Sequence, residues 1–204
     1  MHLTRLSLDP RSAQARRDLA DAYDMHRTLS RVFAQDDVHA PPRFLWRFEP
    51  HGAWSDPVVL VQSAHAAEWA RLDAMGGYLK KSAETKAVPL DRLLQHVARY
   101  RFRLLANPTV TREGKRYGLA AEDAQLAWLA RQGLRCGFEV QAAVVSASDV
   151  LTSNKGGRSI SLQRACFEGV LQVTDVDKVA GVLQEGIGPG KAFGCGLLSL
   201  GPSK

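Results

Sequence analysis

The amino-acid sequence predicts an α+β protein built from two tandem ferredoxin-like (RRM-like) domains, each with the element order βαββαβ. Over the first 107 residues, apolar positions follow the spacing of strand, helix, strand, strand, helix and strand. A similar pattern starts again after a turn-prone stretch at 107–118. The 204 residues, 45% of them hydrophobic, suffice for two domains of about 100 residues each. One continuous α+β domain is the main alternative.

The first predicted domain, residues 1–107, begins with an alternating strand that Asp9 and Pro10 end. Two helical pieces follow, and Asp21 is placed to cap the N-terminus of the second piece. Gly76 and Gly77 end a later helix. The expected strands are 2–8, 43–50, 57–64 and 97–108, and the expected helices are 12–19, 22–34 and 66–75. The polar face of the last strand is almost entirely arginine.

The second predicted domain, residues 108–204, is expected to be a degenerate copy of the first. The expected helices are 121–133 and 175–186, and the expected strands are 138–145, 162–175 and 196–200. The stretch 146–160 is polar and contains glycine, so we expect a loop or a hairpin tip there.

The net charge of +6 and the pI of about 9.5 favour a polyanionic partner such as nucleic acid. Basic residues cluster at 15–17, 99–103, 112–116 and 154–158, several of them beside aromatic residues or glycines. The candidate RNA contacts in the first two clusters are Arg16, Arg17, Arg101 and Arg103. A solvated basic surface with no ligand is the alternative explanation for these clusters.

The sequence indicates no metal site, cofactor site or membrane segment. The three cysteines are far apart in the chain, which favours neither a disulfide framework nor zinc and fits a reducing cytoplasm. No HExxH or DxDxDG pattern occurs. The N-terminus lacks the features of a signal peptide, and no apolar run reaches the roughly 18 residues that a bilayer span requires.

The best candidate for proton transfer near neutral pH is His26. All six histidines lie in the first half of the chain, and this one lies within a strongly patterned helix. Tyr23 and Arg27 share its surface at helical spacing, outside the buried stripe. Imidazole, phenol and guanidinium together suit phosphodiester cleavage in RNA without a metal. A satisfied structural histidine is the alternative, and from spacing alone it is the commoner case.

The segment 186–200 contains five glycines around Lys191. It is not a Walker A loop, because Glu185 replaces the first glycine of that motif and Ala192 replaces its Ser or Thr. Glycines at this density allow close approach of backbone to backbone or to phosphate. Gly188, Gly190 and Lys191 are therefore candidate RNA contacts, although a structural role is equally consistent with the sequence.

Six stretches in order resemble one family over nearly the whole chain. They are HLTRL, RRDLADAYDMHRTL, FRLLANP, AWL, CFEGVLQV and GIGPGKAFGCGLLSL. The chain resembles the CasE family, the CRISPR repeat-RNA endoribonucleases of type I-E effector complexes. The resemblance implies two ferredoxin-like domains. It also implies metal-independent cleavage at the 3′ base of the repeat hairpin, leaving a 2′,3′-cyclic phosphate and a 5′-hydroxyl.

The resemblance also implies roles for particular residues. His26 would be catalytic with Tyr23 assisting, and the glycine-rich loop would help to hold RNA. A basic hairpin of the second domain would enter the RNA groove, with Lys155 and Arg158 as contacts. The implied partners are the repeat hairpin, the mature guide RNA and the other subunits of the effector complex. A non-catalytic RNA-binding or assembly subunit and a small-ligand domain are the remaining alternatives.

Overall fold

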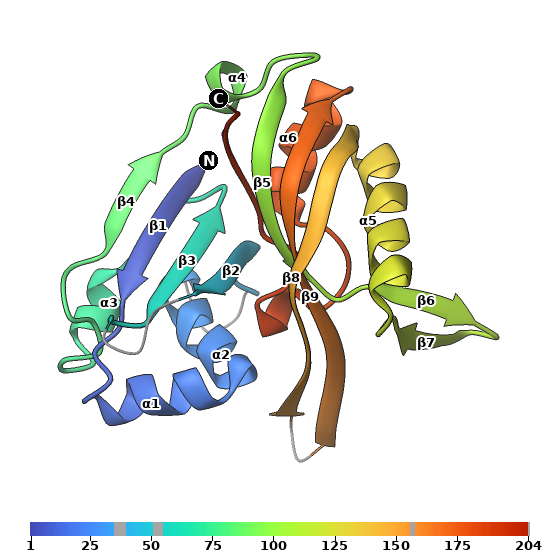
Figure 1. Cartoon of the computed structure of the whole chain (residues 1–204). Coiled ribbons are helices and arrows are strands. Elements are labelled where there is room, and N and C mark those ends of the chain that lie inside the picture. The colour runs from blue at the N-terminus through green and yellow to red at the C-terminus, as the bar shows by residue number, and fades with distance from the viewer. Residues whose placement is uncertain (35–39, 51–54, 156–157, 204) are drawn as a thin grey trace.

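The computed structural model contains two four-stranded antiparallel sheets, and each is the sheet of one ferredoxin-like unit (Figure 1). It describes residues 1–34, 40–50, 55–155 and 158–203. Within these ranges no helix is long and apolar enough to cross a lipid bilayer.

The first unit has strand order β2-β3-β1-β4, the antiparallel order of the ferredoxin-like fold. Its elements are β1 (His2–Ser7), α1 (Ala13–Ala20), α2 (Ala22–Phe33), β2 (Phe44–Glu49), β3 (Val58–Ser63), α3 (Ala70–Asp73) and β4 (Glu84–Ala87). Its core joins the apolar stripe of α2 to the inner faces of β1, β2 and β3. The predicted strands 2–8, 43–50 and 57–64 and the predicted helices 12–19 and 22–34 are confirmed within two residues.

The second unit has strand order β10-β5-β9-β8 and its own core. Its elements are β5 (Arg99–Ala106), α5 (Glu122–Cys136), β8 (Phe138–Lys155), β9 (Arg158–Val173), α6 (Val176–Glu185) and β10 (Leu198–Pro202). A short helix α4 (Leu90–Leu93) precedes it, and the turn η1 (Lys191–Phe193) lies before β10. A separate ribbon of β6 (Thr109–Arg112) and β7 (Lys115–Gly118) is inserted between β5 and α5.

The strand at 97–108, which was expected to close the first sheet, belongs to the second. β5 pairs with β9 and β10, and the first sheet is closed instead by β4, which pairs with β1. The boundary expected at 107/108 therefore separates β5 from its own sheet. With β5 included, the second unit is a complete βαββαβ copy rather than a degenerate one.

Two other local predictions differ from the structure. The helix expected at 66–75 is reduced to the four residues of α3. For the stretch 146–160, the hairpin that was one of the two expectations is present, but it is no loop, because the described parts of β8 and β9 within it are paired strands. We call residues 149–155 and 158–164 the arm. The tip residues 156–157 lie outside the described residues. Leu151, Ile160 and Leu162 of the arm pack against the core of the first unit.

Candidate active site

Helix α2 carries the predicted catalytic residues. A capping residue fixes its N-terminus, and a buried apolar face fixes its orientation. The Asp21 carboxylate caps the helix by accepting a hydrogen bond from the backbone N–H of Tyr23 at 2.8 Å. The predicted stripe of Ala22, Met25, Leu29, Val32 and Phe33 is buried as expected. The opposite face of the helix is thereby turned outward.

Both His26 and Tyr23 lie at the border of that stripe and pack against aromatic rings. The His26 ring is partly buried and stacks on Phe44 of β2, with ring centroids 5.1 Å apart. The Tyr23 ring contacts Phe193 of η1, with centroids 6.0 Å apart. Tyr23 was expected outside the buried stripe, but its ring packs against the core of the first unit. Its phenol is held beside the joint between the two units.

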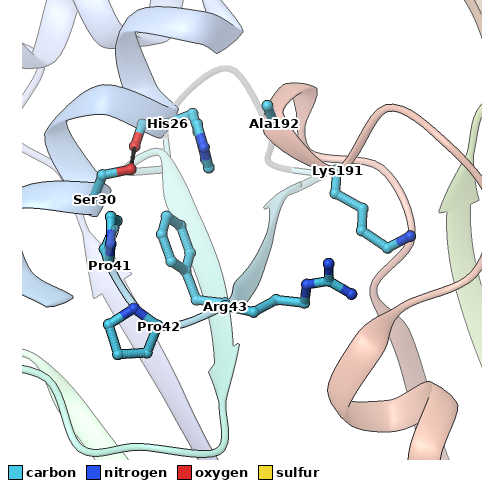
Figure 2. Close-up of a pocket in the computed structure, with 8 residues that line it drawn as sticks. His26, Ser30, Pro41, Pro42, Arg43, Lys191 and Ala192 are labelled. Carbon is cyan, nitrogen blue, oxygen red and sulfur yellow. Dashed lines mark hydrogen bonds between the residues drawn. The ribbon is translucent and has the colours of Figure 1, made fainter. Parts of the chain in front are cut away.

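A cavity of about 430 Å³ opens beside His26 (Figure 2). The described residues that line it come from α2, from the approach to β2 and from η1. They are His26, Ser30, Pro41, Pro42, Arg43, Phe44, Lys191 and Ala192. The imidazole points into this space from one side, and Arg43 and Lys191 extend on the other. The cavity therefore combines residues far apart in sequence, contributed by both units.

The described lining of the cavity carries two basic side chains, Arg43 and Lys191, and no carboxylate. The pKa of the Lys191 ammonium lies below its usual value, first because the group is partly buried and then because the Arg43 guanidinium is near. Lys191 donates a hydrogen bond to the backbone oxygen of Gly188 at 2.7 Å. Two cations that face one space without a lining acid favour binding of an anion such as a phosphodiester.

The glycine-rich loop packs the two units together. A Cβ at Gly186 would come within 2.7 Å of Leu45, and one at Gly194 within 3.2 Å of Trp46; both neighbours belong to β2 of the first unit. Gly188 and Gly190 face the second unit instead, toward Trp128 and Asn107. All four glycines have positive φ, which disfavours any other residue. The loop thereby places Lys191 at the cavity.

The other predicted RNA contacts do not gather at this cavity. Arg16 is exposed and donates to the backbone oxygens of Pro10 and Arg11. Arg17 is also exposed on α1. Arg27 is 60% exposed and forms an ion pair with Asp24 at 3.4 Å.

Two predicted contacts lie on β5 and two near the end of the arm. Arg101 is exposed, and Arg103 forms ion pairs with Glu49 at 3.1 Å and with Glu168 at 3.0 Å between the sheets. Arg103 is therefore engaged within the protein rather than presented outward. Lys155 and Arg158 pair through their backbones at the end of the arm, and their side chains lie outside the described positions.

The arm is bonded to the start of α2. Ser153 is 2% exposed, and its hydroxyl donates a hydrogen bond to the Asp21 carboxylate at 2.5 Å. The same carboxylate oxygen caps α2 through Tyr23. The segment that carries Lys155 and the helix that carries His26 are thus joined through one buried side chain.

One lining residue was missed by the sequence reasoning, namely Arg43. It stands alone between two prolines and an apolar strand, so no basic cluster marks it. Its contact with the site depends on how β2 passes α2, which sequence periodicity does not encode. Among the described residues there is no group of three or more histidine, cysteine, aspartate or glutamate side chains that could hold a metal ion.

Comparison with known proteins places the chain in a family. The chain belongs to the CRISPR-associated protein family, whose model matches residues 1–202. It is 37% identical over 216 residues to the CRISPR-associated endoribonuclease Cse3 of Thermus thermophilus, covering 99% of this chain and all of the relative. It is 32% identical over 195 residues to the CRISPR system Cascade subunit CasE of Escherichia coli, covering 89% of this chain and 92% of that subunit.

The fold agrees with these sequence relationships. A solved structure of the CRISPR endoribonuclease Cse3 bound to a 19-nucleotide RNA superposes with a TM-score of 0.88 at 36% identity. The superposition covers 99% of this chain and all of that one. The family and the tandem ferredoxin-like fold predicted from the sequence are thereby confirmed.

Proposed function

We propose that this protein is a metal-independent endoribonuclease that binds the hairpin of a CRISPR repeat and cuts precursor CRISPR RNA at the 3′ base of the stem. The nucleophile is the 2′-hydroxyl next to the scissile phosphate, so the products are a 2′,3′-cyclic phosphate and a 5′-hydroxyl. Because the RNA supplies its own nucleophile, the protein needs to provide proton transfer and charge stabilisation.

The observation that carries this proposal is the cavity beside His26. It places an imidazole opposite Arg43 and Lys191, with no carboxylate among its described lining residues. The phosphorane formed during attack carries more negative charge than the starting diester, and two cations held in place stabilise it. An imidazole has a reference pKa near 6.5, so it can take or give a proton at neutral pH.

Each residue of the proposed site has a distinct role. His26 is either the base that removes the proton of the 2′-hydroxyl or the acid that protonates the departing 5′-oxygen. Tyr23, one turn earlier, donates a hydrogen bond or orients the phosphate. Arg27 lies on the same helix and is exposed enough to reach an RNA phosphate. Gly188, Gly190 and Lys191 hold the RNA chain along the glycine-rich loop.

The arm supplies recognition of the stem. The A-form duplex is read mostly through its shape and backbone, for which basic side chains on a projecting hairpin are suited. Lys155 and Arg158 at the end of the arm, together with Arg16, Arg17 and Arg101, are the proposed backbone contacts, whereas Arg103 is engaged by Glu49 and Glu168. After cleavage the protein is proposed to stay on the mature guide RNA as a subunit of a type I-E effector complex in the cytoplasm. The name of the Escherichia coli relative, a CRISPR system Cascade subunit, supports membership of such a complex.

The test is cleavage of a repeat hairpin in excess EDTA, with analysis of the new RNA ends. We expect cleavage to persist and the 5′ product to end in a cyclic phosphate. His26→Ala should slow cleavage by about 10²- to 10⁴-fold, the usual contribution of a general acid or base, with hairpin affinity little changed. His96→Ala, which changes an exposed histidine elsewhere, is the matched control. Intact RNA under EDTA would refute metal independence.

The alternative is a subunit that binds RNA without cutting it, in which the same cavity holds a phosphate and nothing more. Tight, salt-sensitive hairpin binding by the wild type with no product under any condition would favour it. Equal affinity for the hairpin and for a mononucleotide would contradict both forms of the proposal.

A further inference from the structure

The ribbon of β6 and β7 is the most prominent basic feature that the proposed site does not use. It projects from the lower end of the second sheet, beside α5 and apart from the arm (Figure 1). Nearly all of its outer half is exposed. Three of its ten residues, Arg112, Lys115 and Arg116, are cationic, and Glu113 is the one acid among them.

The register of the ribbon decides which side chains share a face. Arg112 is paired with Lys115, and Val110 with Tyr117, so these four lie on one face. The other face carries Gly118 and lies against β9, because a Cβ added at Gly118 would come within 2.6 Å of the Gln163 side chain. The face with two cations and a tyrosine is therefore turned away from β9.

That outward face has no ligand within the protein. In the part of the chain that the structure describes, Arg112 and Lys115 form no ion pair and no side-chain hydrogen bond. Tyr117 is 49% exposed, so its ring presents a large apolar surface on β7, whose four residues are all exposed. An aromatic ring beside two cations is the combination that binds single-stranded nucleic acid, by stacking a base and pairing with its phosphates.

The base of the ribbon is fixed close to the proposed active site. β6 starts two residues after Asn107, which is 2% exposed and lies against Gly190 of the glycine-rich loop. On the other side, Gln125 donates hydrogen bonds to the backbone oxygen of Leu119 at 2.8 Å and to the hydroxyl of Ser148 at 3.0 Å. The ribbon is thus held both to the loop that walls the cavity and to the start of the arm.

We propose that the β6–β7 ribbon binds the single-stranded RNA that flanks the repeat stem, with Arg112 and Lys115 on its phosphates and Tyr117 stacked on a base. The inference rests on the proposed function, because it takes the stem to lie on the arm and the cut to occur at the cavity. A stem on the arm leaves its flanking strand beside the ribbon. Single-stranded RNA is favoured over a duplex because a half-exposed aromatic ring can stack only on an unpaired base.

The test compares two RNAs with the variant Arg112→Gln/Lys115→Gln. One RNA is a repeat stem-loop alone, and the other has its single-stranded flanks; a 2′-deoxy nucleotide at the cut position keeps both intact. We expect affinity for the flanked RNA to fall at least tenfold. The slope of log K against log salt should become shallower by about 1.4, since each of the two contacts to a single strand contributes about 0.7. Affinity for the bare stem should not change.

Lys86→Gln/Arg92→Gln is the matched control. It removes the same charge from exposed positions at the opposite end of the molecule and should leave both affinities unchanged (Figure 1). Tyr117→Ala should weaken only flanked RNA, by about tenfold. An equal loss on both RNAs, or no loss on either, would overturn the proposal. Wild-type protein that binds neither RNA would instead overturn the proposed function.

Discussion

Arg47 is the side chain whose removal should most weaken the joint between the two units. It lies on β2 of the first unit and is 3% exposed. Its guanidinium bonds Glu49 at 2.6 Å, the backbone oxygens of Arg103 and Leu197 at 3.2 Å each, and the hydroxyl of Ser199 at 3.0 Å. The last three acceptors belong to β5, β10 and the residue before β10, so one planar group bridges the two units.

Arg47→Met should lower the free energy of unfolding by about 3–5 kcal/mol, the usual cost of breaking a buried ion pair by removing one partner. Two buried carbonyl oxygens lose a donor, at about 1–3 kcal/mol each. Glu49 keeps its ion pair with Arg103 at 3.1 Å, so the loss of unfolding free energy should lie near the lower end of that range. A domain stability of about 5–15 kcal/mol would leave the variant folded at 25 °C.

Equilibrium unfolding in urea measures this loss, with Arg5→Met as the control. Arg5 forms an exposed ion pair with Glu84 at 3.2 Å, both side chains being 48% exposed, and such pairs contribute about 0–1 kcal/mol. A loss for Arg47→Met no larger than that of the control would refute the assignment. Because the cavity takes walls from both units, cleavage should also slow in Arg47→Met, although no cavity residue is changed.

Two further variants test how the site is held. Gly194→Ala should lower the free energy of unfolding by about 1–3 kcal/mol and slow cleavage, because Gly194 has a φ of 78° and an added Cβ would press on Trp46. The control is Gly181→Ala in α6, where an added Cβ has nothing within 4 Å. It should be neutral or stabilising in the same urea titration. Ser153→Ala should lower the single-turnover cleavage rate more than the hairpin affinity, because it removes the bond between the arm and the Asp21 carboxylate that caps α2. An equal loss of rate and of affinity would show that Ser153 merely supports the arm.

The sequence predicted local structure well where the signal is local. The capping aspartate and the apolar stripe placed α2 within one residue, and the position of His26 at the border of that stripe followed from the same periodicity. The glycine-rich segment was recognised from composition, since the positive φ at these positions is strained for any residue other than glycine. The resemblance to a family came from stretches of this kind.

The errors concern pairing between distant segments. β5 is strongly patterned, but nothing within residues 97–108 specifies whether it pairs with β1 or with β9 and β10. β4 gave no apolar signal because all four of its residues are exposed on an edge. Arg43 escaped notice for a related reason, since its place at the cavity depends on how β2 passes α2.

Building the cavity from both ends of the chain has a consequence for synthesis on the ribosome. His26 and Arg43 are made early, whereas the turn that carries Lys191 emerges on the order of ten seconds later at about 5–20 residues per second. Until then the pocket lacks one wall, and Leu45 and Trp46 lack the loop that covers them. A nascent chain should therefore be unable to perform the proposed cleavage of RNA, including its own messenger, before residues 191–193 have emerged.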